Sequence, residues 1–368
     1  MSAALPPVRR PLRASLAAWA RTVVPTPRQV PGLLLAAAVA TAASALAGLP
    51  WLQAHGISAL TLAIVLGMLV GNTVYPRLAP RADHGIAFAK TTLLRAGIVL
   101  YGIRLTFADV ASIGPSGLLM DVLMLASTFA GAFWIGTRVL RLDRETALLI
   151  GAGSSICGAA AVMAAQPMVK GRAEHVTIAV ATVVVFGTLA MFSWPALYRI
   201  GAEHGLLRWT GQDYGVFVGA TVHEVAQVLV AGRALGPEAA DAAVITKMVR
   251  VMMLAPALML VAFLIARGRP QHAAASAPTR IAVPWFAFGF IAVTALNSVA
   301  PLPQPWKGLG MAVDDLLLAM AMAGLGLTTH VSALRRAGMR PMALAALLFA
   351  WLLFGGLAVH HMVGQLQH

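Results

Sequence analysis

Two short stretches carry residues that could bind a charged solute within an apolar chain. The first, residues 150–158, reads IGAGSSICG. Glycines let a helix unwind, and freed amide N–H groups at the start of a following helix attract anions. We therefore expect an anion-binding nest, whose members are Gly153, Ser154, Ser155, Cys157 and Gly158. Small-residue packing between helices is the alternative explanation.

The second stretch, residues 219–228, reads GATVHEVAQV. A glutamate inside an apolar segment is costly, so Glu224 must be neutral, paired or in a wet cavity. Histidine titrates near neutral pH, and we expect His223 and Glu224 to carry a coupling proton, with Gln227 at the substrate. The HExxQ spacing lacks the second histidine of a zinc motif, so no metal is expected. A buried polar pair that only fixes helix packing is the alternative.

A pair of cations follows in the segment 241–266. Lys247 and Arg250 lie three residues apart and share one helix face. Two cations at membrane depth need anionic partners, and we expect them to bind the substrate, with Glu224 neutralising one of them. The alternative is that both side chains extend to the membrane interface.

Four charged residues are secondary candidates. Arg95 and Lys90 are expected to pair with Asp121 in the next segment, or else to line a pathway. Asp314 lies near the start of an apolar segment, where acids favour a helix N-terminus.

A second helix break is possible after residue 326. Gly324 and Gly326 precede Thr328, Thr329 and His330. Glycines weaken a helix, and the polar side chains would then face the break.

Composition decides the class of protein that presents these residues. Of the 368 residues, 59% are hydrophobic and 11% are charged, which excludes a soluble enzyme and a disordered chain. The single cysteine excludes a disulfide framework. The net charge of +14 fits basic cytoplasmic loops rather than nucleic-acid binding.

The expected elements are apolar helices. Each span needs about 20 residues. We expect segments at about 31–50, 57–76, 85–105, 116–138, 147–168, 174–198, 214–232, 241–266, 282–300, 309–330 and 341–364.

Loop charges indicate how the segments cross. The basic loops at 77–83, 138–145, 267–280 and 335–340, with the basic tail, are placed in the cytoplasm. Lys170 and Arg172 then fall on the wrong side, unless 147–168 and 214–232 re-enter or break rather than cross. We expect about nine crossings plus these two segments, with eleven crossings as the alternative.

The chain divides into four parts. We expect a basic cytoplasmic tail at 1–29, a membrane bundle at 30–266, a cytoplasmic linker at 267–280 and three further helices in a bundle at 281–368. No nucleotide-binding GxxxxGK[ST] motif occurs, so transport would use a gradient rather than ATP. No catalytic constellation or cofactor site is evident, and an enzyme is not expected.

Weak internal similarity suggests repeats. YGIRLT at 101–106 resembles AGLGLT at 323–328, and NTVYP at 72–76 resembles NSVAP at 297–301. In the re-entrant topology the matched pieces run in opposite senses, as inverted repeats do. Chance similarity among apolar helices is the alternative.

Five motifs together resemble those of a known family. The runs are LLRAGIVLYGIRLTF (93–107), IGAGSSICGAAAV (150–162), GATVHEVAQV (219–228), KMVRVMMLAP (247–256) and AMAMAGLGLTTHVSALRRAG (319–338). They are similar to the sulfate exporter family, the YeiH-type inner-membrane proteins of bacteria. The resemblance implies an inverted-repeat fold like that of sodium/proton antiporters and bile-acid symporters, with a core that moves against a scaffold.

Residues and resemblance predict one function. We expect a multi-pass inner-membrane transporter, with a cytoplasmic N-terminus, that exports a small anion such as sulfate and is coupled to protons or ions. Transport of another small organic anion and cation/proton antiport, the latter with Glu224, Asp121 and Asp314 as carriers, are the alternatives. A homodimer is common among similar folds.

Overall fold

A computed structural model describes residues 25–54, 57–254, 256–257, 259–260, 285–300, 302–329 and 338–365. The described residues are predominantly helical and include no strand, which confirms the predicted all-α class for this part of the chain. Six of their helices are long and apolar enough to cross a membrane. Three shorter apolar helices accompany them: Ala59–Thr73, Ala159–Val169 and Trp285–Val299.

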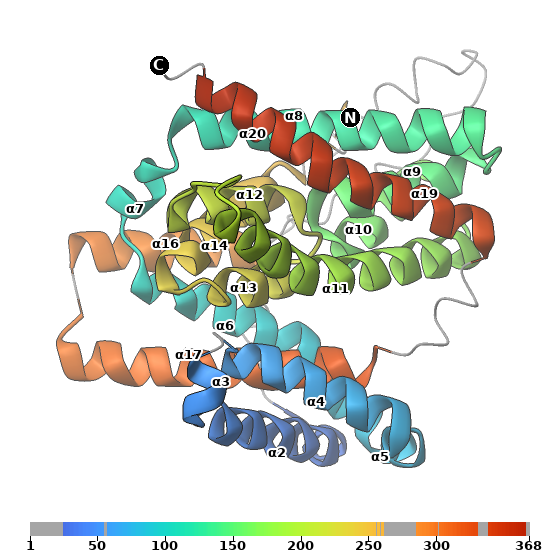
Figure 1. The fold of residues 1–368 in the computed structure, drawn as a ribbon. Helices are drawn as coiled ribbons and strands as arrows, with labels where there is room; N and C mark the ends of the chain where they lie inside the picture. The colour runs from blue at the N-terminus through green and yellow to red at the C-terminus, as the bar shows by residue number, and fades with distance from the viewer. Residues whose placement is uncertain are drawn as a thin grey trace, which may run out of the picture.

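The first bundle combines helices from the first third of the chain with two helices from its last quarter (Figure 1). The long helix α17 packs along α4, α2 and α6, although these are more than 200 positions earlier in the sequence. Close approach of α4 and α17 depends on glycine, because a Cβ at Gly67 would lie 2.5 Å from the carbonyl oxygen of Ala323. The members are α2 (Val30–Ala47), α4 (Ala59–Thr73), α5 (Tyr75–Phe88), η2 (Ala89–Leu93), α6 (Leu94–Tyr101), η3 (Gly102–Arg104), α16 (Trp285–Val299) and α17 (Gln304–Leu327).

The second bundle lies beside the first and surrounds the two stretches that carry the candidate site (Figure 1). Its short helices α12, α13 and α14 pack tightly on one another, and α8, α11, α19 and α20 pack around them and α9. The members are α8 (Gly114–Trp134), α9 (Arg144–Ala152), η5 (Gly153–Cys157), α10 (Ala159–Val169), α11 (Ala173–Glu203), α12 (Gly211–Thr221), α13 (Val225–Arg233), α14 (Pro237–Met252), α19 (Met339–Ala350) and α20 (Gly356–Gln365).

One predicted loop is helical. Residues 77–83, expected to form a basic loop, belong to α5, and helical turns continue without interruption to Arg104. Pro76 stands at the start of α5, where an N–H group would have no intrahelical acceptor. Pro80 removes one backbone hydrogen bond, and packing of α5 against α2 outweighs that cost. The predicted linker 267–280 and residues 1–24 of the predicted tail lie outside the described residues.

The outer surface of the helices is apolar. Large side chains on five different helices are at least half exposed: Leu34, Leu69, Trp134, Leu189 and Phe354. Such a surface would be unfavourable in water and suits the hydrocarbon of a bilayer. The charged residues Asp121, Lys247 and Arg250 are instead buried between helices. This distribution is that of a membrane protein.

Candidate functional site

A glycine interrupts the first candidate stretch. The π-helical turn η5 continues α9 to Cys157, and Gly158 then takes φ +72° and ψ −138° before α10 begins at Ala159. A positive φ of this kind favours glycine, because a side chain would be strained there. The predicted unwinding at Gly158 is present, and it leaves the carbonyl end of η5 and the amide end of α10 facing the same region.

An extended segment interrupts the second candidate stretch. Helix α12 ends at Thr221, and both Val222 and Glu224 are extended before α13 begins at Val225. The side-chain oxygen Oε1 of Gln227 accepts a hydrogen bond from the amide of Glu224 at 3.1 Å. This bond satisfies one of the free amides at the start of α13. Each of the two stretches is therefore a pair of half-helices.

The two interruptions meet, and we call residues 153–159 and 221–225 the crossover. The amide of Ala159 donates a hydrogen bond to Oε1 of Glu224 at 3.2 Å. Glycine is required beside this contact, because a Cβ at Gly158 would lie 2.3 Å from Cγ of Glu224. A carboxylate is electrostatically favourable at the N-terminus of a helix. The N-terminus of α10, which attracts anions, is thus in contact with Glu224, a carboxylate of the same chain.

Lys247 links the carbonyl ends of two half-helices, η5 and α12. Its ammonium Nζ donates to the carbonyl oxygens of Ile156 and Val222, both at 2.7 Å. These carbonyls close η5 and α12, where the helix dipole favours a cation. Lys247 is 1% exposed. An ammonium has three donors, so two of them hold the crossover together and one stays available to a ligand.

Arg250 forms an ion pair one turn further along α14. Its Nε lies 2.9 Å from Oδ1 of Asp121 on α8, and its Nη2 donates to the backbone oxygen of Asp121 at 3.4 Å. The sequence suggested Lys90 or Arg95 as the partner of Asp121, and that pairing is wrong. Arg95 instead lies over the ring of Phe286, 5.9 Å from its centroid.

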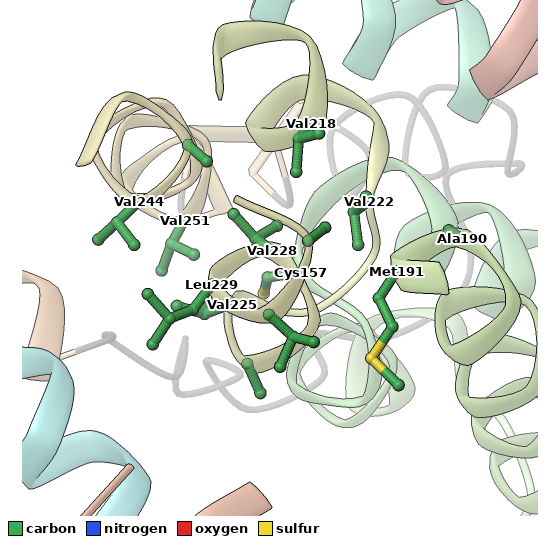
Figure 2. Packing of buried hydrophobic residues seen from close by; sticks show 14 of the residues in the cluster. Cys157, Ala190, Met191, Val218, Val222, Val225, Val228, Leu229, Val244 and Val251 are labelled. Carbon is green, nitrogen blue, oxygen red and sulfur yellow. The ribbon is translucent and has the colours of Figure 1, made fainter. Parts of the chain in front are cut away.

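Several polar side chains at or beside the crossover are buried without a hydrogen-bond partner among the described residues. They are Ser155 Oγ, His223 Nδ1 and Gln227 Nε2, on residues that are 0%, 1% and 0% exposed. Ser154 is also buried. Cys157 lies in the apolar cluster with Val222, Val225 and Val228, as Figure 2 shows. Polar atoms in such surroundings are costly unless a ligand or water pairs with them.

The threonines of the break predicted after residue 326 belong to the first bundle. Thr328 ends α17 and accepts a 3.4 Å hydrogen bond from Lys90 of η2. The backbone oxygen of Thr329 accepts a bond from Asn72 at 3.0 Å. Lys90 also lies within electrostatic range of Glu224. His330 lies outside the described residues.

Two contacts that the sequence does not predict connect the bundles. The Tyr101 hydroxyl donates to Asp241 at 2.7 Å, and Arg233 lies 3.5 Å from Asp315. We call these two contacts the interbundle contacts. Charges and hydroxyls within apolar helices signal such pairs, although the sequence does not show which residues meet.

Asp314 has a different role from the one expected. Helix α17 begins at Gln304, so Asp314 is well inside the helix rather than at its N-terminus. Its Oδ2 pairs with Nε of Arg104 at 2.9 Å, and Arg104 also contacts Asp315 at 2.8 Å. Burial of Asp314, with a side chain 1% exposed, requires this partner.

The fold and the crossover define a class: a multi-helix membrane protein with two interrupted helices that meet inside its second bundle. The family model described as Conserved hypothetical protein 698 matches residues 31–345. A UPF0324 membrane protein of Pseudomonas aeruginosa, PA5383, is 59% identical over 336 residues, covering 91% of this chain and 95% of that protein. The UPF0324 inner membrane protein YeiH of Escherichia coli K12 is 51% identical over 335 residues, covering 91% and 94%.

The chain therefore belongs to the UPF0324 family. The relative in Salmonella typhi, also named inner membrane protein YeiH, is 51% identical over 338 residues, covering 92% of this chain and 95% of that protein. No solved structure matches the chain significantly.

Proposed function

We propose that this protein is a secondary transporter that exports a small anion, such as sulfate or a related sulfur oxyanion. The observation that carries the proposal is the amide end of α10, which already holds a carboxylate, Glu224. A site that accommodates one oxyanion group offers the chemistry that a sulfur oxyanion needs. The buried cations Lys247 and Arg250 add positive charge nearby.

Several features of the arrangement support transport rather than a purely structural role. Interrupted helices inside a membrane expose backbone groups that need a protein or water partner. In many transporters such helices bind the substrate near the midplane, between repeats that rock against each other. We propose the same here, with the first bundle as scaffold, inverted repeats in the sequence and a cytoplasmic N-terminus. Coupling to protons would use His223 and Glu224.

Cation/proton antiport is the second candidate. The observation that favours it is the presence of carboxylates between the helices: Asp121 and Asp314 are buried, and Glu224 is partly buried. Arg250 forms an ion pair with Asp121, and Arg104 forms one with Asp314. These pairings favour the anion transporter.

Flux measurements separate these functions. The purified full chain in proteoliposomes is tested with radiolabelled sulfate and sulfite, with and without a pH gradient, and with sodium in a parallel arm. We expect saturable flux of a sulfur oxyanion that does not require sodium. Sodium flux that is independent of sulfate and sulfite would identify a cation antiporter instead.

A further inference from the structure

The carboxylate of Glu224 occupies the place where an anion would bind. It accepts the amide of Ala159, the first residue of α10, and its backbone precedes the first residue of α13. Two helix N-termini therefore converge on one acidic residue. The first amides of a helix have no intrahelical acceptor, so whichever anion is present competes for them.

Two side chains near the helix interruptions carry buried polar atoms that a ligand could satisfy. Gln227 contacts Glu224 through Oε1, yet its Nε2 has no partner among the described residues and the residue is 0% exposed. Ser155 Oγ, at the other side of the Gly158 break, is likewise buried and unpartnered in the described part. Buried donors without acceptors are costly, and an oxyanion with several acceptor oxygens would satisfy them.

The balance of charge depends on Glu224. Arg250 is paired with Asp121, while Glu224 lies within electrostatic range of Lys247 and Lys90. Loss of the negative charge on Glu224 makes the surroundings of the Ala159 amide more positive by one charge. The titratable groups within electrostatic range of Glu224 are Lys90 on η2, Cys157 on η5 and Lys247 on α14, and His223 precedes it in the chain.

We propose that Glu224 and the transported anion compete for the amide end of α10, so that a proton and an anion bind the crossover together. This inference rests on the proposed function. The proton moves from water to a carboxylate oxygen of Glu224, and the neutral acid releases the Ala159 amide to an anion oxygen. No covalent bond to the substrate forms or breaks. Proton and anion then travel in the same direction, as cotransport.

Reciprocity gives the proposal a direct test. If the proton promotes anion binding, the anion must promote proton binding by the same factor. Radiolabelled sulfate is bound to the purified full chain at a series of pH values, because sulfate keeps its charge from about pH 5 to about pH 9. Proton uptake on sulfate addition is measured with a pH indicator in weak buffer. Glu224→Gln removes the titrating group, and the exposed Glu174→Gln on α11 is the matched control.

The expected results are specific. The wild type and E174Q bind sulfate more tightly as pH falls, approaching tenfold per pH unit, and take up about one proton per sulfate when Glu224 begins ionised. E224Q binds sulfate with little pH dependence and takes up no proton. If E224Q does not fold, Glu224→Ala supplies the same comparison, and proton uptake by the wild type remains decisive alone.

Two kinds of failure are distinguishable. Sulfate binding by the wild type that is independent of pH, or that releases protons, would overturn the cotransport inference and leave the anion transporter intact. Retained pH dependence in E224Q would assign the proton to another group, such as His223, and would also overturn it. Absence of binding of both sulfate and sulfite at every pH, in folded wild type, would overturn the proposed function and this inference with it.

Discussion

Arg250 and Asp121 form an ion pair between α14 and α8, with Nε 2.9 Å from Oδ1 and both side chains 1% exposed. Removing one partner from a buried pair leaves an uncompensated charge and costs about 3–5 kcal/mol. We predict that Asp121→Asn markedly lowers the thermal unfolding midpoint in detergent. Glu203→Gln, at the exposed end of α11, is the control and should change the midpoint little. Equal midpoints for wild type and D121N would show that the pair does not stabilise the fold.

Lys247 should stabilise the crossover as well as attract the substrate. Replacing it with methionine keeps the length of the side chain and leaves two buried carbonyls, of Ile156 and Val222, without their donor. The expected cost is about 1–3 kcal/mol for each carbonyl, measured as a lower unfolding midpoint. Lys307→Met, on the less buried start of α17, is the control. A midpoint unaffected by K247M would mean that these bonds contribute little.

The Tyr101–Asp241 hydrogen bond should lower the population of the state in which the two bundles are separated. Tyr101→Phe removes a 2.7 Å bond between α6 and α14 and keeps the ring. A bond of about 1 kcal/mol corresponds to about a fivefold change in the population of separated bundles. The measurement is modification of Cys157, the single thiol of the chain, by a small thiol reagent.

We expect faster Cys157 modification in Y101F than in the wild type. The control is Tyr75→Phe, which removes a hydroxyl bonded to Asp83 within α5 of the first bundle. If Y75F and Y101F accelerate modification equally, the effect comes from general loosening, and the contact between bundles has no special role.

The sequence predicts where the helices break better than it predicts which residues meet. Gly158 lies in a glycine-rich stretch, and an extended Val222–Glu224 segment follows from a histidine and a glutamate that are costly within a helix inside the membrane. These are local properties. Burial of Lys247 and Arg250 was likewise expected from two cations in an apolar segment.

Contacts between residues that are far apart in the sequence could not be predicted from such local properties. Ala159 and Glu224 are 65 positions apart, and Arg250 and Asp121 are 129 apart. Lys90, Arg95 and Arg250 are all basic residues in apolar segments, so charge alone does not select the partner of Asp121. The selection depends on how α8 and α14 pack, which is a property of the assembled bundle.

The most direct test of the crossover as the transport site uses two glycines that both have a positive φ. Gly158 has φ +72° and Gly205 has φ +69°, so alanine is strained at both. A Cβ at Gly158 would collide with Glu224, whereas nothing lies within 4 Å of a Cβ at Gly205. Sulfate and sulfite flux is measured in proteoliposomes for Gly158→Ala, Gly205→Ala and the wild type. We predict that G205A keeps wild-type flux and that folded G158A loses it; equal flux in both variants would contradict transport through the crossover.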